Sequence, residues 1–126
     1  MVNLFTGYFA QIRKYINTGL VCISISGKAP SFYTGLEYKK LAPKYSFFIK
    51  YKNREIGEEE YTSEYYRLVL NNLDPQKVIE DINNLTNFAN YIVLLCYEKP
   101  GDFCHRHIVA KWLTENTNFK VEELSV

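Results

Sequence analysis

Hydrophobic residues recur along the chain with two spacings, which predict strands and helices in turn. Residues 91–97 carry the apolar run Ile92 to Leu95, whose length is typical of a strand covered on both faces. Residues 20–26 instead alternate, with three branched apolar side chains on one face, and predict a second strand. We expect residues 20–26 to lie parallel beside residues 91–97.

Apolar residues with helical spacing predict four helices, at residues 8–17, 58–72 and 74–87 and from Cys104 onward. In the third, Asp74 has the position of an N-cap and Pro75 that of the first helical residue. A short helical turn is expected around residues 37–41.

Three further segments have the character of strands. Residues 45–52 alternate, with Phe47 and Ile49 opposite Phe48 and Lys50, and predict a strand. Residues 119–124 predict a last strand. Near the amino end, Leu4-Phe5 predicts a short edge strand that Gly7 ends by turning the chain.

This order of elements predicts one α/β domain over residues 1–126. Strands that alternate with helices favour a mostly parallel sheet, here of about four or five strands, with helices on both faces. The chain has 126 residues, 47% of them hydrophobic, which is enough for a core of ordinary size. Neither repeats nor a domain linker interrupt the pattern.

A loop joins the strand at 91–97 to the helix that begins near Cys104. Lys99-Pro100-Gly101-Asp102 predicts the loop because Pro and Gly stop regular structure, and Asp102 is the expected N-cap. In the helix, four apolar residues mark the buried stripe: Ile108, Val109, Trp112 and Leu113. Four residues earlier on that stripe, Cys104 and His105 point inward, whereas Arg106 flanks it.

The junction of strand, loop and helix is where ligands of α/β proteins usually bind. The free N–H groups at a helix start make such a place mildly electropositive. A cysteine there tends toward the thiolate, and an arginine there can grip a carboxylate or phosphate with two hydrogen bonds. Residues 104–106, Cys-His-Arg, are therefore candidates for a binding or catalytic site.

The segment 94–113, LLCYEKPGDFCHRHIVAKWL, resembles the signature of the bacterial "domain of unknown function 488" family (DUF488). That family carries a strand ending in Leu-Cys-x-Glu, a short loop and Cys-His-Arg, matched here by Leu95, Cys96, Glu98 and residues 104–106. Weaker likeness extends to residues 24–30 and 38–43. The resemblance implies a small α/β domain, and the family name carries no activity with it.

These observations lead to one candidate site, in which the strand ends and the helix start share a crevice. Cys104, His105 and Glu98 are its candidate catalytic residues; Arg106, Ser26, Lys28 and Cys96 are its candidate ligand-binding residues. The leading hypothesis is the binding of a small anionic or nucleotide-like ligand. Whether the chain is an enzyme, and with which cofactor, stays open.

Each candidate also has a structural interpretation. Cys104 is also consistent with a small apolar filler, and His105 with a buried neutral imidazole bonded to a carbonyl or to Glu98. Arg106 can pair with Glu98 or Asp102 instead of a ligand. The spacing of Cys and Arg differs from that of phosphocysteine phosphatases, which argues against a phosphocysteine mechanism.

We assign no metal ligands from the sequence. Cys96, Cys104 and His105, with Cys22 or Glu98, are residue types that bind zinc, but no Cys-x-x-Cys pair supports a site. In addition, the side chains of adjacent residues such as Cys104 and His105 are expected to diverge. A thiol-dependent or metal-dependent enzyme at Cys104 is therefore an alternative to the leading hypothesis.

Charge is distributed unevenly along the chain. Residues 1–54 carry nine Lys or Arg and one acid, whereas residues 55–126 carry six Lys or Arg and thirteen acids. The basic residues between Lys39 and Arg54 alternate with aromatic ones, a mixture that suits a nucleic-acid backbone and its bases. A nucleic-acid-associated module is the second alternative, and a solvated basic loop its structural counterpart.

Three cysteines are an odd number and lack the spacing of a disulfide scaffold, which favours a reducing cytoplasm. Apolar runs are all shorter than the ~20 residues needed to cross a bilayer, so we expect no membrane association. Oligomeric state is not constrained by the sequence.

Overall fold

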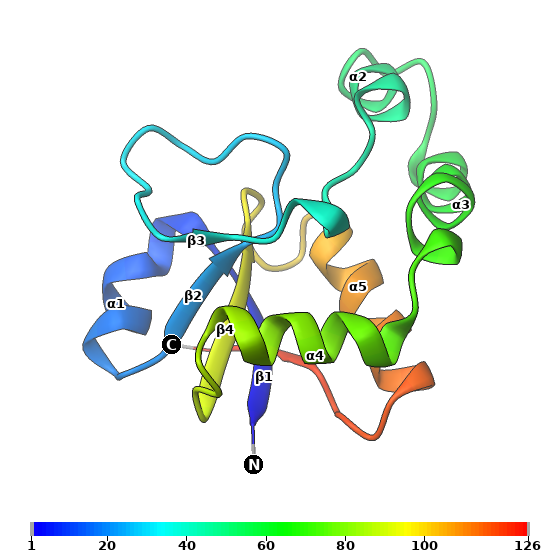
Figure 1. The fold of residues 1–126 in the computed structure, drawn as a ribbon. Helices are drawn as coiled ribbons and strands as arrows, with labels where there is room; N and C mark the ends of the chain where they lie inside the picture. Colours follow the sequence, from blue (N-terminus) through cyan, green and yellow to red (C-terminus); the bar gives the residue numbers. More distant parts are fainter. Residues whose placement is uncertain (1, 126) are drawn as a thin grey trace.

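A parallel five-stranded sheet lies at the centre of the computed structural model, which describes residues 2–125 (Figure 1). The strands lie in the order β3-β2-β4-β1-β5, and every neighbouring pair is parallel. Their bounds are β1 Asn3–Tyr8, β2 Val21–Ser24, β3 Leu36–Glu37, β4 Tyr91–Cys96 and β5 Glu122–Glu123. The prediction of an α/β fold with a mostly parallel sheet is confirmed.

Helices cover both faces of this sheet. Their bounds are α1 Ile12–Asn17, α2 Tyr45–Lys52, α3 Glu58–Leu68, α4 Pro75–Leu85 and α5 His105–Asn116, and short 3-10 turns occupy Phe9–Gln11, Lys39–Leu41 and Leu70–Asn72. Figure 1 shows α1 on one side of the strands and α4 and α5 on the other. Among residues 2–125, no helix combines the length and the apolar character that a membrane span requires.

The apolar run of β4 serves two hydrophobic clusters, one on each face. Ile92 and Leu94 belong to the larger cluster, which α4 and α5 also fill. Val93 and Leu95 belong to the smaller cluster, together with Tyr15 of α1. Successive side chains of a strand point to opposite faces, so a central strand needs apolar residues at every position. This is why β4 lacks the alternation of a surface strand.

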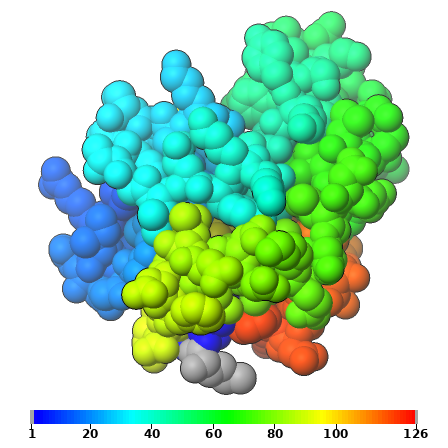
Figure 2. All heavy atoms as spheres, in the orientation of Figure 1, coloured from blue at the N-terminus to red at the C-terminus, as the bar shows by residue number. Residues whose placement is uncertain are grey.

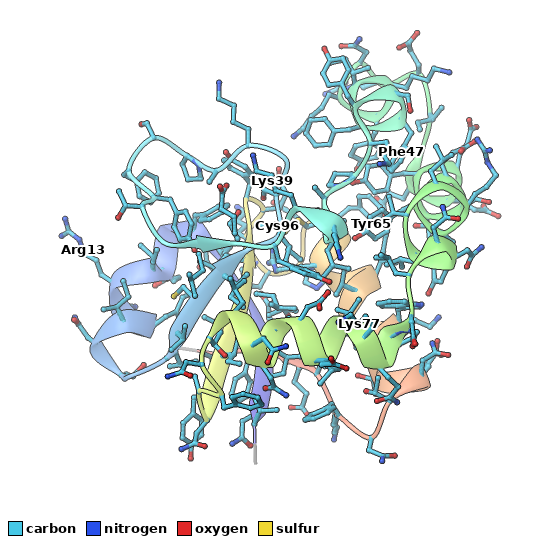
Figure 3. All side chains as sticks on the ribbon, viewed as in Figure 1. Arg13, Lys39, Phe47, Tyr65, Lys77 and Cys96 are labelled. Atoms are coloured by element: carbon cyan, nitrogen blue, oxygen red, sulfur yellow. A yellow bond between two sulfur atoms is a disulfide. The ribbon has the colours of Figure 1, made fainter. Side chains whose placement is uncertain are left out.

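Residues 45–52 form helix α2, so the predicted strand is wrong. Phe47 is buried in this helix and packs edge-on against Tyr61 of α3, with ring centroids 5.0 Å apart. Figure 3 labels Phe47 beneath α2 and beside α3, and Tyr65 on the inner side of α3. The preference of aromatic residues for strands reflects side-chain packing against neighbouring strands. Here the aromatic side chains pack between helices α2 and α3 instead, and this tertiary packing overrides the preference.

The amino-terminal segment also differs from expectation. β1 is longer than the predicted edge strand and lies between β4 and β5. Gly7 is a strand residue and makes no turn; a Cβ atom there would lie 2.5 Å from the hydroxyl oxygen of Tyr15. The glycine therefore permits close packing of α1 on β1. The short strand β3 was not predicted.

A buried ion pair joins α5 to the last strand. Arg106 is fully buried, and its Nε and Nη2 donate to the two carboxylate oxygens of Glu123 over 3.0 and 2.9 Å. Thr6 of β1 donates a further bond of 2.7 Å to the same carboxylate. β5 has only two residues, so these side-chain hydrogen bonds supplement the few backbone hydrogen bonds that join it to β1.

Replacing Glu123 by Gln should lower the free energy of unfolding by about 3 kcal/mol, because it leaves a guanidinium buried without its counter-charge. The side chain of Glu123 is 24% exposed, so we expect the lower end of the range for broken buried pairs. Urea unfolding measures the change. Glu122→Gln, on the same strand but with an exposed side chain, is the control and should change stability by less than ~0.5 kcal/mol. Equal effects of the two substitutions would contradict a structural role for the pair.

Candidate functional site

A cavity of about 1050 Å³ opens at the carboxyl ends of β2 and β4. Its lining comes from the segment after β2, from α2 and α3, and from the loop between β4 and α5. Figure 2 shows the cyan loop that follows β2 and the green α2–α3 region next to each other on the surface. The structure thus confirms the expected parallel pairing of residues 20–26 with 91–97, whose register runs from Val21 opposite Ile92 to Ser24 opposite Leu95.

The segment after β2 brings Ser26 and Lys28, two of the candidate ligand-binding residues, to the cavity lining. Ser26 is only 4% exposed, and its hydroxyl has no hydrogen-bond partner among the described residues. A buried hydroxyl usually has a partner, because leaving it without one costs about 1–3 kcal/mol. Lys28 is exposed, and its carbonyl accepts a hydrogen bond from the hydroxyl of Tyr97 across the cavity edge.

Helix α5 begins differently from the prediction. Cys104 is the N-cap residue and has extended backbone angles, φ −154° and ψ 147°. Asp102 was expected in this role but lies exposed in the loop, and its N–H donates to the carbonyl of Lys99. The extra loop residues let Phe103 pack on Tyr51 and Tyr61, at centroid distances of 5.1 and 5.0 Å. The start of α5 is therefore fixed by packing and by no side-chain cap.

His105 is a buried, neutral imidazole at the cavity floor. Its Nε2 lies 2.7 Å from the carbonyl oxygen of Ile25, just beyond the end of β2. A carbonyl oxygen only accepts, so Nε2 carries the proton and Nδ1 keeps a free lone pair. Burial lowers the pKa of His105 to about 4, the bond to Ile25 opposes that shift, and the nearby charge of Arg106 adds to it. The expected bond from His105 to a carbonyl is thus present, and Glu98 is not its partner.

Cys96 and Cys104 lie side by side between the end of β4 and the start of α5. Their Sγ atoms are 2.04 Å apart and form a disulfide, a pairing that the sequence did not predict. Cys104 Sγ is 3.8 Å from His105 Nδ1. Figure 3 labels Cys96 at the end of β4, in the middle of the molecule. The third cysteine, Cys22, is free and buried in the smaller hydrophobic cluster, where burial raises the pKa of its thiol to about 11.

Arg106 does not line the cavity, so its proposed contact with a ligand needs correction. Its guanidinium is committed to Glu123, and its Nη1 donates to Cys96 Sγ over 3.2 Å. The partners expected from the sequence, Glu98 and Asp102, are both replaced by Glu123. The sequence offered no sign of this pairing, because seventeen residues and a chain reversal separate the two side chains.

Glu98 does line the cavity, near its rim. Its carboxylate pairs with Lys52 of α2 at 3.4 Å, and both side chains are substantially exposed. This ion pair places one positive and one negative group at the mouth of the cavity, where either group can contact a solute.

Aromatic side chains of α2 and α3 make up the wall that sequence reasoning missed. Phe48, Tyr51 and Tyr61 line the cavity, and Phe103 joins them from the loop before α5. A helical interpretation of residues 45–52 would have found part of this wall, because Phe48, Tyr51 and Lys52 then share one face. The arrangement can hold a flat, apolar group against the aromatic wall, while polar groups lie at the floor and the rim.

Comparison with known families supports the resemblance seen in the sequence. A family model described as DUF488-N3a, the active DUF488-N3 subclade, matches residues 28–117, which include the cavity segments from Lys28 to the start of α5. The curated proteins contain no match to the chain. The solved structures contain none either. Because the family model covers well over half of the chain, the protein belongs to the DUF488 family.

Proposed function

We propose that this protein binds a small, anionic, nucleotide-like ligand in the cavity between β2, β4 and the α2–α3 pair. The observation that carries the proposal is Ser26, a residue of the cavity lining whose buried hydroxyl has no partner among the described residues. A ligand that brings a hydrogen-bonding group to this hydroxyl would remove the cost of leaving it unpaired.

The walls of the cavity suit a planar group such as a nucleobase. Three rings, those of Phe48, Tyr51 and Phe103, line it together. Stacking on aromatic side chains stabilises a bound base by about 1–3 kcal/mol and works for every base, since each has a π-face. Such a wall therefore favours planar bases as a class and selects no particular base.

The rim of the cavity suits an anionic group. The lining includes Lys28 and Lys52, both exposed to solvent; Lys52 is paired with Glu98 at 3.4 Å, so most of the available positive charge comes from Lys28. Ammonium groups at the mouth of a partly enclosed site raise the local concentration of anions. The carboxyl edge of a parallel sheet is also where α/β proteins commonly bind such ligands.

The description of the matching subclade as active supports a chemical role for the same cavity. Cys104, His105 and Glu98 are the residues we propose for that role, with Ser26, Lys28 and Cys96 in contact with the ligand. Arg106 is a positioning residue, because it acts through Cys96 and Glu123. The odd cysteine count is the basis for proposing a reducing cytoplasm as the setting, and in that setting the Cys96–Cys104 disulfide would be reduced to two thiols.

Two competing functions remain as outcomes of the tests. In the basic segment 39–54, Lys40 and Lys52 already face carboxylates at 3.7 and 3.4 Å, which reduces the charge available to a nucleic acid. Oligonucleotide binding that weakens steeply with salt and disappears in the Lys40, Lys44 and Lys50 triple alanine variant would favour the nucleic-acid module. After reduction of the Cys96–Cys104 disulfide, labelling of Cys104 by iodoacetamide well below pH ~8.5 would favour a nucleophilic thiol.

Ser26→Ala should weaken nucleotide binding about fivefold, which corresponds to a hydrogen bond of ~1 kcal/mol. Saturation-transfer NMR with adenosine, guanosine and uridine monophosphates identifies the best probe, and calorimetry then measures its Kd. Lys28→Ala should weaken binding by a similar factor. Lys14→Ala removes an equal charge from α1, away from the cavity lining, and should leave the Kd unchanged. If none of the three monophosphates binds at millimolar concentration, the proposed ligand class is wrong.

Phe48→Leu should weaken binding of the same probe at least tenfold, because it removes a ring that stacks on the base. Phe88→Leu is the matched control: Phe88 is 67% exposed and lies before β4, at the opposite end of the sheet. Circular dichroism and thermal unfolding verify that both variants are folded. A Kd that is the same in both variants would mean that the aromatic wall has no part in binding.

A further inference from the structure

We propose that Cys96, Cys104 and His105 together bind one zinc ion at the floor of the cavity. Their ligand atoms, two Sγ and one imidazole nitrogen, all lie within 4.8 Å of one another. All three residues are buried and also line the cavity. Sulfur and imidazole nitrogen are the donors that zinc prefers in proteins. The site shares the cavity of the proposed function but does not require that its ligand be a nucleotide.

Local backbone geometry brings two adjacent side chains to the same point, contrary to expectation. Cys104 is extended and His105 is the first residue of α5, so the chain changes direction between them. As a result Cys104 Sγ and His105 Nδ1 are only 3.8 Å apart. The objection that neighbouring Cys and His side chains must diverge therefore does not apply at this helix start.

The hydrogen bond of His105 orients the imidazole for an ion. Its Nε2–H donates to the carbonyl of Ile25 at 2.7 Å, which leaves the lone pair of Nδ1 directed toward the thiols. Histidines that bind metals almost always donate their other N–H to a carbonyl, a carboxylate or a water in this way. The bond selects the tautomer and fixes the ring before an ion arrives.

The backbone spacing of the two cysteines also suits a shared ion. Their Cα atoms are 7.3 Å apart, whereas disulfide-bonded cysteines usually have Cα atoms about 4.4–6.8 Å apart. Two thiolates bound to one zinc at about 2.3 Å with tetrahedral geometry stand roughly 3.8 Å from each other, so they tolerate a wider backbone separation. The bonded pair takes up two electrons and two protons from a dithiol reductant to become two thiols. Zinc then displaces the two thiol protons.

Charge around the site is close to balanced when zinc is bound. Two thiolates offset the double charge of the ion, and the imidazole is neutral. Arg106 donates from Nη1 to Cys96 Sγ at 3.2 Å, while its own charge is met by Glu123. With three protein ligands, the fourth position of a tetrahedral zinc is open. Because the three ligands line the cavity, that position is available to a water molecule or to a group of the bound ligand.

The test is the zinc content of the full chain, purified without a metal-affinity tag in the presence of a dithiol reductant. After dialysis against zinc and then against zinc-free buffer, elemental analysis should find about one zinc ion per chain. Cys96→Ser, Cys104→Ser and His105→Gln should each reduce it to background. Cys22→Ser is the matched control, because this third thiol lies in the cluster on the other face, and it should keep the full content.

A second measurement on the unaltered chain does not depend on how well the variants fold. Cobalt substituted for zinc should give the intense near-ultraviolet absorption of thiolate-to-cobalt charge transfer, and added zinc should remove it. Reduced protein that holds no zinc, or that re-forms the Cys96–Cys104 disulfide in preference to binding zinc, would overturn the proposal. Both measurements are made without a nucleotide, so failure of nucleotide binding leaves their outcome unaffected.

Discussion

The parallel pairing of β2 with β4 is the constraint on which the candidate site depends. Their register places Ser24 opposite Leu95, and the N–H of Ile25 continues the ladder to the carbonyl of Leu95 at 3.0 Å. The carbonyl of Ile25 then receives the bond from His105. One continuous set of backbone and side-chain bonds thus ties the end of β2 to the start of α5, and it positions the imidazole of His105 at the cavity floor.

The block Cys-His-Arg divides into two roles because of where each side chain points. Cys104 and His105 line the cavity floor, whereas Arg106 turns into the protein and is fully buried. A buried guanidinium needs a counter-charge, and Glu123 of β5 supplies it. The same arginine bonds to Cys96, so the charge that stabilises the last strand also borders the thiol pair.

Sequence reasoning succeeded where local rules and burial agree. The run at β4, the alternation at β2 and the Asp74 cap with Pro75 were all read correctly, and the carboxylate of Asp74 accepts the N–H of Gln76 at 3.0 Å. It failed at residues 45–52, which alternate in sequence but form helix α2. Over only eight residues, an apolar pattern of period two does not decide whether the segment itself forms a strand or a helix rich in aromatic residues.

By itself, the sequence determined the α/β class, the central strand, the segments that meet at its carboxyl end and the membership in the DUF488 family. These features depend on the spacing of hydrophobic residues and on a local motif, and both can be recognised from residues that are close together in the sequence. Only the tertiary structure decided that Arg106 pairs with Glu123, that Cys96 lies against Cys104, and that α2 and α3 wall the cavity. Such contacts join residues far apart in the chain or across a loop, and their geometry follows from packing of the whole molecule.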